Sequence, residues 1–577
     1  MKQLAVSLVF AINACMSNPP VISQPPHEQP APKEYPKGYF RNPLDIPIQL
    51  AANFGELRNN HFHMGFDIRT NQRENLAVHA AAEGYVSRIK IERYGFGRAI
   101  YITHPNGYTT LYAHLNNFYP ELNNYIVEKQ YADEEWEQEI EFSPEQFPVK
   151  KGQFIANSGN TGGSQGPHLH FEIRDTKTGN NLNPWLFGFG LSDNILPFIY
   201  RLYYYDRRYS TYQISPAPIP IAGANGRYAA RNNTVILSSP YIGFGIAAED
   251  KSSPSAFRYG IYSADVYVDD SLKSRFKLDN ISYNDTRYIN GSIDYKTKQS
   301  EGGYIQYLTR LPGNHTTIFS DPVNGDILIN DTLVHTAKIV VGDASGNNSV
   351  LNFKFRYAPS RNEELMFAAN SIPLIPNQVN EVKMDDIEAV FSPGAFYDTV
   401  PFVLSSLPPN DAKVVSAIHS LHSYKVPVHD SFTVRIKPVV PLSDIDKDKV
   451  VMQIVSNSKI EAVKGRWVGK FMEAKFRDFG ILKLIKDTVP PRITPGAGVN
   501  GGNMRNKKSF TIYVKDNVGE LRSFSAYVDN KWLMFSRKGD AFIHTFDDRV
   551  SAGSHVLRVR VEDIAGNVTE REYSFTR

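Results

Sequence analysis

GPHLHFEIR, residues 166–174, alternates between polar and apolar side chains from its first histidine onward. This period of two is typical of a β-strand with one buried face. One side of the strand would carry two imidazoles and a carboxylate, at His168, His170 and Glu172. The other side would be apolar throughout. We therefore expect a strand that holds two histidines side by side above a buried face.

Two earlier stretches supply partners for these histidines. NHFHMGFDI, residues 60–68, contains His63, Gly65 and Asp67 in the spacing His-x-Gly-x-Asp. AIYITHPNGYTTLYAHL, residues 99–115, predicts a hairpin around a Pro-Asn-Gly turn, and its second strand ends near His114. We expect His114 to continue the strand face that carries Tyr108, Thr110 and Tyr112.

The motifs HMGFD, YAHL and SGNTGGSQGPHLHFEIR resemble, in this order, those of the lysostaphin/LytM-type zinc endopeptidases. The resemblance covers about a quarter of the chain. It implies an antiparallel β catalytic domain that cuts peptide bonds of bacterial peptidoglycan. It also implies one Zn²⁺ ion bound by His63, Asp67 and His170, with His114 and His168 as the two unligated catalytic histidines.

The residue types suit this chemistry. A catalytic zinc takes three protein ligands and one water, and two imidazoles with one carboxylate leave the metal a net positive charge. We expect His168 to act as the general base and His114 to steady the oxyanion or orient the water, although either histidine fits either role. His61 is expected to lie in a loop or to support the metal ligands from behind. His79 and His104 are expected to be ordinary turn or sheet residues, and Glu172 a hydrogen-bonding anchor.

The N-terminus predicts export. A short apolar run follows Lys2 and is too short to span a bilayer, as in a signal peptide. It ends at Cys15 in a sequence that resembles a bacterial lipobox, so residues 1–15 are expected to be a signal peptide with lipidation at Cys15. That lipid would tether the protein to a membrane. A proline-rich linker is expected over residues 16–42, and the expected location is the periplasm or cell envelope.

Composition narrows the alternatives. The net charge is +3 without a cluster of basic residues, which argues against nucleic acid as a partner. A single cysteine excludes an internal disulfide. The 32 Tyr and 34 Phe, with many Gly and Pro, favour β-rich domains. Length predicts several domains.

We expect a mostly β protein with a zinc metallopeptidase domain at residues 43–190. Three β-rich units are expected to follow it: a β-sandwich with an insertion at residues 191–357, a β-rich domain at 358–486 and an immunoglobulin- or fibronectin-like β-sandwich at 487–577. The two sandwiches are predicted from an internal repeat, in which DNILPFI (193–199) matches DTVPPRI (487–493). Both copies end on an Asp-x-x-Gly-Asn turn before the last strand.

Three classes of function follow. The first is a zinc endopeptidase acting on peptidoglycan stem peptides, with the D,D-crosslink as the expected bond and a glycine bridge or a non-wall peptide as alternatives. The second is a catalytically silent scaffold that activates other wall hydrolases, and the third is a surface adhesion or glycan-binding protein. An acidic segment at residues 115–146 either walls or gates the substrate groove or is a solvated helix or hairpin without a role.

Overall fold

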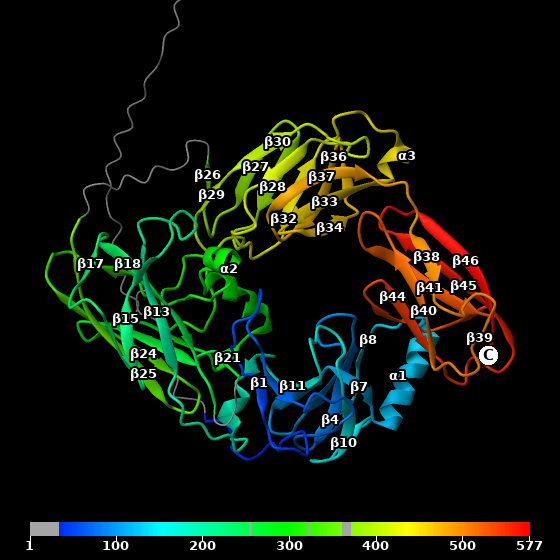
Figure 1. Cartoon of the computed structure of the whole chain (residues 1–577), viewed down its shortest axis with the longest axis horizontal. Helices are drawn as coiled ribbons and strands as arrows, with labels where there is room; N and C mark the ends of the chain where they lie inside the picture. The colour runs from blue at the N-terminus through cyan, green and yellow to red at the C-terminus, as the bar shows by residue number, and fades with distance from the viewer. Residues whose placement is uncertain (1–33, 253–256, 321–323, 360–370) are drawn as a thin grey trace, which may run out of the picture. The chain divides into compact units, whose positions relative to one another are not determined.

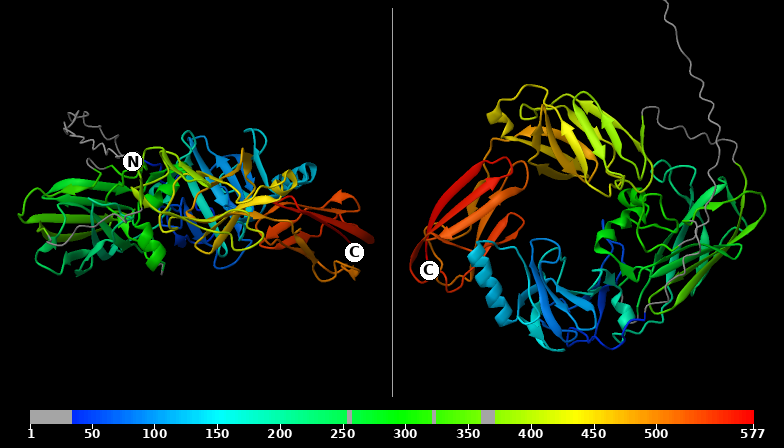
Figure 2. Two further views of the ribbon diagram at one scale, coloured as in Figure 1. Left: turned by 90° about the horizontal axis from the view of Figure 1, so that it is seen from above. Right: turned by 180° about the vertical axis from the view of Figure 1, so that it is seen from behind.

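The structure is a computed structural model that describes residues 34–252, 257–320, 324–359 and 371–577. Strands hold 46% of the residues and helices 7%, which confirms the predicted mostly β fold. Residues 37–577 form one compact unit. Along it, the strands gather into successive groups of sheets from blue to red (Figures 1 and 2). The predicted signal peptide, Cys15 and most of the predicted linker lie outside the described residues.

The first group of strands forms a large sheet and a small one. The large sheet has the order β1-β2-β11-β6-β5-β4-β8, with β9 beside β4 and β12 beside β11, and the small sheet has the order β3-β10-β7. The elements are β1 (Leu50–Ala52), β2 (Phe66–Arg69), β3 (Ala77–His79), β4 (Gly84–Ile91), β5 (Arg98–Thr103), β6 (Tyr108–Ala113), β7 (Leu115–Phe118), α1 (Pro120–Asp133), β8 (Gln138–Glu141), β9 (Pro148–Val149), β10 (Phe154–Ser158), β11 (His168–Asp175), β12 (Asn181–Leu182) and the short 3₁₀ helix η1 (Pro184–Phe187).

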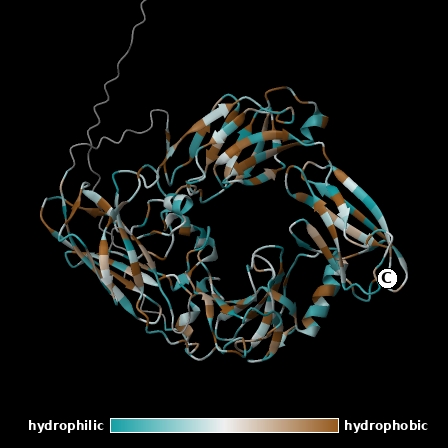
Figure 3. Ribbon diagram, viewed as in Figure 1, coloured by the Kyte–Doolittle hydropathy of each residue, from teal (hydrophilic) through white to brown (hydrophobic). Residues whose placement is uncertain are grey.

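Strand β11 lies in the middle of the large sheet, between β2 and β6. Its Leu169, Phe171 and Ile173 side chains are all fully buried, as the alternating pattern predicts. The same alternation of apolar and polar residues is visible along many strands in Figure 3. The buried face anchors β11, so that its other face can carry polar groups in a constant orientation.

The predicted hairpin is present as β5 and β6, which pair antiparallel around residues 104–107. The prediction for His114 was wrong, however, because β6 ends at Ala113 and His114 leaves the alternation of that strand. Its backbone takes the left-handed conformation with φ 61°, and its N–H donates to the carbonyl of Phe96. This conformation costs energy for a residue with a Cβ and is often found at functional sites. The turn redirects the chain from the large sheet into β7 of the small sheet.

The second group, from residue 198 to 357, consists of two further sheets. Their orders are β14-β13-β18-β22, with β23 beside β18, and β15-β16-β25-β24-β19-β20, with β17 beside β25. The elements are β13 (Phe198–Asp206), β14 (Ala217–Ile219), β15 (Ile221–Ala224), β16 (Arg227–Ala230), β17 (Val235–Leu237), β18 (Tyr241–Glu249), β19 (Ser263–Val268), β20 (Ser271–Lys277), β21 (Asn280–Ile281), the 3₁₀ helix η2 (Tyr283–Gly291), α2 (Tyr295–Glu301), β22 (Gln306–Tyr307), β23 (Ile327–Leu328), β24 (His335–Gly342) and β25 (Asn348–Tyr357).

This second group shares its core with the first. Strand β21 pairs with β12 and so extends the large sheet of the first group. Phe54, Phe62 and Met64 are buried in the hydrophobic core of the second group. The apolar core is therefore continuous across residue 190, where the sequence predicts a domain boundary.

The third group contains two five-stranded sheets, β27-β28-β32-β36-β35 and β30-β31-β37-β33-β34, and the pair β26-β29. Its elements are β26 (Ile372–Leu374), β27 (Asn380–Lys383), β28 (Ile387–Phe391), β29 (Val400–Phe402), β30 (Leu404–Leu407), β31 (Ile418–Leu421), β32 (Phe432–Ile436), α3 (Asp444–Lys447), β33 (Val450–Ser456), β34 (Lys459–Val463), β35 (Arg466–Val468), β36 (Phe471–Phe476) and β37 (Gly480–Lys486). Residues of both large sheets share one core.

The fourth group has the sheets β38-β40-β44-β43 and β39-β46-β45-β41-β42 around one core. Its elements are β38 (Arg492–Pro495), β39 (Gly502–Asn503), β40 (Ser509–Lys515), β41 (Leu521–Val528), β42 (Lys531–Trp532), β43 (Ser536–Lys538), β44 (Ala541–Thr545), β45 (Ser554–Asp563) and β46 (Val568–Thr576). The repeat seen in the sequence has matching contacts here, since Asp269 bonds to His335 and Asp529 to His555, both at 2.6 Å.

The acidic segment after His114 folds into α1 and β8. Leu122, Ile126 and Gln130 form the buried stripe of α1, and β8 pairs with β4 as the last strand of the large sheet. Among the described residues, no helix combines the length and apolar character that crossing a bilayer requires.

Candidate active site

The register of three strands brings the predicted site residues together. His170 on β11 lies directly opposite Asp67 on β2 and opposite Ala113 on β6. His168, two residues earlier on β11, projects from the same face. Ala113 immediately precedes His114, so this register also brings His114 close to His170 and Asp67.

His63 reaches this point from the loop before β2, and Gly65 makes the approach possible. A Cβ added at Gly65 would lie 2.3 Å from the carbonyl oxygen of Phe171 and 2.9 Å from Cγ of Glu172. The first of these neighbours is backbone of the histidine strand and has little freedom to move. The spacing His-x-Gly-x-Asp therefore places a glycine where the loop packs directly on β11.

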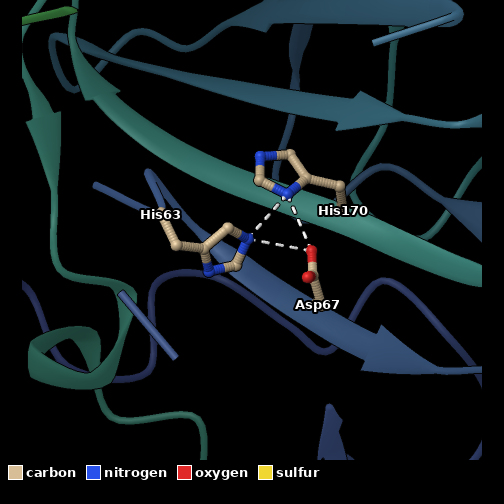
Figure 4. A group of neighbouring side chains, drawn as sticks. All are labelled: His63, Asp67 and His170. Carbon is tan, nitrogen blue, oxygen red and sulfur yellow. Dashed lines mark hydrogen bonds and ion pairs between the residues drawn. The ribbon is translucent and has the colours of Figure 1, made fainter. Parts of the chain in front are cut away.

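The three predicted zinc ligands form a compact triangle (Figure 4). Nε2 of His63 lies 2.9 Å from Oδ1 of Asp67 and 3.1 Å from Nδ1 of His170, and the third side, from His170 Nδ1 to Asp67 Oδ1, is 2.9 Å. Ligand atoms around a tetrahedral zinc are about 3.3 Å apart, given bond lengths near 2.0–2.1 Å. The three atoms need to separate by only a few tenths of an ångström to hold such an ion.

The remaining nitrogen of each ligand histidine is already engaged. Nδ1 of His63 donates to the carbonyl of Asn53 at 2.6 Å, and Nε2 of His170 donates to Oε1 of Glu172 at 2.9 Å. With these outer nitrogens as donors, the nitrogens that face the triangle are the ones left to bind a metal ion. Outer partners of this kind set the tautomer and orientation of metal-binding histidines.

Glu172 has the anchoring role that the sequence predicts. It is fully buried, and its Oε2 accepts from Nε of Arg174 at 2.7 Å. Burial would raise its pKa, but Arg174 and His170 lower the pKa of Glu172 to about 2. A carboxylate that stays ionised holds the imidazole of His170 in place.

The electrostatics of the triangle favour added positive charge. Burial alone would lower the pKa of His170, but hydrogen bonds to Asp67 and Glu172 raise it to about 9. Burial likewise opposes ionisation of Asp67, yet the surrounding histidines hold its pKa well below the usual range. A divalent cation satisfies the same demand, so two imidazoles and one carboxylate fit a zinc ion in charge, donor type and spacing.

The two histidines predicted to be unligated lie beside the triangle. The ring centroids of His114 and His168 are 4.7 Å apart, and Nε2 of His168 lies 3.3 Å from Oδ1 of Asp67. Nδ1 of His114 donates to the carbonyl of Thr161, and Nδ1 of His168 donates to that of Gly166, both at 2.8 Å. In the neutral tautomer with hydrogen on Nδ1, the lone pair of each ring lies on Nε2. Burial and the neighbouring His170 and His168 lower the pKa of His114 to about 3, which keeps this imidazole neutral.

These side chains border a cavity of about 810 Å³. Two of its lining residues, Phe257 and Tyr283, belong to the second group of strands. The Tyr283 ring lies 4.9 Å from the guanidinium of Arg174 and 6.1 Å from the ring of Phe96. Arg69 lies 4.9 Å from the ring of Phe257. The second group therefore forms part of the wall of the pocket. The sequence did not predict this contribution from the second group.

Arg58 is a further residue that sequence reasoning missed. Its Nη2 lies 3.2 Å from Oδ2 of Asp67, the carboxylate oxygen that faces away from the triangle. Arg58 precedes the His-x-Gly-x-Asp spacing by five residues, and no pattern in the sequence distinguishes it from other surface arginines. His61 also lines the pocket, but it donates to the carbonyl of Asn59 and stands outside the triangle.

The segment 115–146 supplies no described residue to the lining of this pocket. It contacts the fourth group instead, since Tyr527 donates to Oε2 of Glu134 at 2.8 Å, and the rings of Tyr131 and Trp532 are 5.2 Å apart. These contacts give no support to the idea that the segment walls the groove.

Residues 61–131 and 138–184 match peptidase family M23, and residues 373–487 match the Zu5-like domain. An uncharacterized metalloprotease of Haemophilus influenzae is 30% identical over 154 residues, which are 26% of this chain and 27% of that protein. The DD-carboxypeptidase/endopeptidase Mpg of Neisseria meningitidis is 34% identical over 153 residues, covering 26% and 29%. The chain thus spans less than a third of the length of these relatives.

Two solved structures resemble the same part of the chain. The catalytic domain of lysostaphin from Staphylococcus simulans has 22% identity and a TM-score of 0.18, covering 24% of this chain and 92% of that one. The catalytic domain of EnpA, an M23 protein from Enterococcus faecalis, has 21% identity and a TM-score of 0.20, covering 26% and 96%.

Proposed function

We propose, from an N-terminal region that belongs to peptidase family M23, that this protein is a zinc-dependent endopeptidase that hydrolyses peptide crosslinks of bacterial peptidoglycan. One observation carries the proposal. Three buried ligand atoms, from His63, Asp67 and His170, converge within 3.1 Å of one another, and the second nitrogen of each imidazole is already bound to an acceptor.

A Zn²⁺ ion at this triangle supplies a Lewis acid that acidifies a bound water and polarises a carbonyl group. The chain itself supplies the ligands and the proton acceptors. Glu172 and the carbonyl of Asn53 hold the two ligand imidazoles in orientation.

His168 and His114 both direct Nε2 toward the region beside the triangle, and in the neutral tautomer with hydrogen on Nδ1 this nitrogen can take a proton from water and later return it to the leaving amine. On both rings, Nε2 is the nitrogen that is not bonded to a backbone carbonyl. A pKa of about 3 makes His114 the weaker proton acceptor of the two, so we keep His168 as the proposed general base and His114 as the residue that orients the water or steadies the oxyanion.

The substrate and location extend this proposal. Mpg, which resembles the M23 region, is named a DD-carboxypeptidase/endopeptidase, and this supports a D,D-crosslink of stem peptides as the bond. We propose that the enzyme works in the periplasm or cell envelope, tethered through a lipid on Cys15. A silent scaffold is the second candidate, but the complete set of ligands disfavours it, since such relatives typically lose metal ligands.

Zymography on purified sacculi tests the proposal. Clearing that a chelator abolishes and added Zn²⁺ restores is the expected result, and mass spectrometry of the products from a defined muropeptide would identify the bond. Binding to sacculi without clearing, by protein shown to contain zinc, would contradict the enzyme and favour the scaffold or the adhesion protein.

A further inference from the structure

Outside the active site, the described residues contain two more groups of acidic side chains close enough to share an ion. Both groups occupy corresponding places in the second and fourth groups of strands. In each, one carboxylate oxygen per residue lies within 4.8 Å of the others; the sets are Asp193, Asp250 and Asp343, and Asp487, Asp516 and Asp563.

The two sets match position by position. The first aspartate lies in the segment that leads into the first strand of its group, β13 or β38. The second directly follows β18 or β40, and the third stands at the end of β24 or β45. The first and third positions belong to the internal repeat of the sequence, whereas the second position was not detected there.

An asparagine closes both sets with the same contacts. Nδ2 of Asn347 donates to Oδ2 of Asp343 at 2.7 Å and to the carbonyl of Asp193 at 3.1 Å. Nδ2 of Asn567 does the same to Asp563 at 2.9 Å and to the carbonyl of Asp487 at 3.1 Å. The Asp-x-x-Gly-Asn turn therefore joins the entering segment to the end of a core strand in both copies.

Each set contains a buried carboxylate oxygen without a hydrogen-bond partner among the described residues. These are Oδ1 of Asp250 and Oδ2 of Asp487, in side chains that belong to residues only 5% and 1% exposed. Oδ1 of Asp516 is a third such atom. An unpartnered buried carboxylate oxygen is costly, and in a native protein it often marks the place of an ion.

Charge adds to this cost. Three carboxylates share each small space, and within the described parts of the chain no salt bridge to a basic side chain is formed by Asp487, Asp516 or Asp563. In the first set, burial and the neighbouring Asp343 and Asp193 raise the pKa of Asp250 to about 8. A bound cation would remove the repulsion in both sets.

We infer that each set binds one Ca²⁺ ion, which ties the segment entering the β-structure to the ends of two of its strands. The donors are all carboxylate oxygens, which suit hard cations and give no preference for zinc. Ca²⁺ accepts irregular geometries with additional carbonyl or water oxygens, whereas Mg²⁺ demands a near-ideal octahedron. The ions would serve stability and the path of the chain, and none of these six aspartates lines the active-site pocket.

Calcium binding is best measured in the full-length chain carrying His170→Ala, so that the zinc site does not contribute. Calorimetric titration with CaCl₂ after removal of metals should show two ions per chain, with dissociation constants below about 1 mM. The thermal midpoint should rise by several degrees in Ca²⁺. Asp250→Asn and Asp516→Asn should each remove one ion, and the double variant both.

Asp270→Asn and Asp540→Asn are matched controls, because they alter exposed aspartates of the same two regions. Both should keep two ions. The inference is overturned if the background protein binds no Ca²⁺ below 1 mM, if the two variants keep both ions, or if Mg²⁺ binds as tightly. The number of Ca²⁺ ions bound by the His170→Ala protein tests the inference even if an asparagine variant fails to fold. This number does not depend on peptidase activity.

Discussion

His170 and His168 stand two residues apart on one face of β11, yet their environments differ. Both nitrogens of His170 are engaged, one toward Asp67 and His63 and the other by Glu172. His168 has its Nδ1 bound to the carbonyl of Gly166 and its Nε2 beside the triangle. The first arrangement suits a metal ligand and the second a proton acceptor.

We predict that His170→Ala loses zinc, because only two protein ligands remain, and that it loses all turnover. His168→Ala should keep one zinc per chain while turnover falls by about 10²- to 10⁴-fold, the usual contribution of acid–base catalysis. Metal analysis alongside muropeptide hydrolysis separates the two variants. Zinc retained in both proteins would show that the ligand assignment is wrong.

Gly65 offers a second test at the scale of one residue. Gly65→Ala should force the loop of His63 away from β11, since the new Cβ would meet the backbone of Phe171 at 2.3 Å. We expect a loss of about 1–3 kcal/mol in the free energy of unfolding and at least tenfold weaker zinc binding. Gly303→Ala is the control, because a Cβ there meets nothing within 4 Å. Equal zinc affinity in both variants would contradict the role given to Gly65.

His104 links stability to pH. It is buried, its Nδ1 donates to the carbonyl of Glu83, and burial lowers its pKa to about 4. Because the unfolded chain has the higher pKa, near 6.5, the unfolded state binds more protons between pH 6.5 and 4, so stability falls as the pH decreases through this range. The loss attributable to His104 reaches up to about 3 kcal/mol.

His104→Asn should show a smaller decrease in the free energy of unfolding between pH 7 and 4 than the natural protein. Asparagine can still donate to Glu83 but does not titrate. Urea unfolding at a series of pH values measures the difference between the two proteins, in which the contributions of other groups cancel. Parallel curves would mean that His104 does not contribute.

At the scale of elements, Tyr283, the first residue of the 3₁₀ helix η2, lines the active-site pocket. Tyr283 belongs to the second group of strands but packs its ring near Arg174 and Phe96 of the first. The pairing of β12 with β21, just before η2, fixes this placement. The pocket is therefore lined mostly by residues of the first group, together with Phe257 and Tyr283 of the second.

We predict that Tyr283→Ala lowers kcat/KM several-fold while leaving zinc content unchanged, because a wall of the pocket is removed but no ligand is touched. Tyr283→Phe is the matched control, since both contacts are made by the ring. It should behave like the natural protein. Steady-state kinetics on a muropeptide measures both, and a Phe variant as impaired as the Ala variant would assign the effect to the hydroxyl group.

At the scale of the whole molecule, the active-site region depends on its neighbour for part of its hydrophobic core. Phe54, Phe62 and Met64 are at most 3% exposed, and they pack with residues of the second group. Burial of each such side chain adds roughly 1.5–3 kcal/mol to the free energy of unfolding. Separation of the two groups would expose all three.

A chain cut after residue 190 should therefore aggregate or unfold at a lower temperature than a chain cut after residue 357, which retains the shared core. Thermal unfolding and size-exclusion chromatography of the two truncated chains test this. If the shorter chain were equally stable, the shared core would contribute little.

The sequence by itself determined the strand of His168 and His170, the hairpin of β5 and β6, and the residues expected to bind zinc. The strand and the hairpin follow from local alternation and turn chemistry, which act over a few residues, whereas the expected zinc ligands follow from the resemblance of the motifs to a known family. The turn at His114, the walls supplied by Tyr283 and Phe257, and the meeting of Asp250 with Asp193 and Asp343 were decided only by the tertiary structure. They depend on which strands pair and which cores merge, and such contacts between distant segments leave no periodic pattern in the chain.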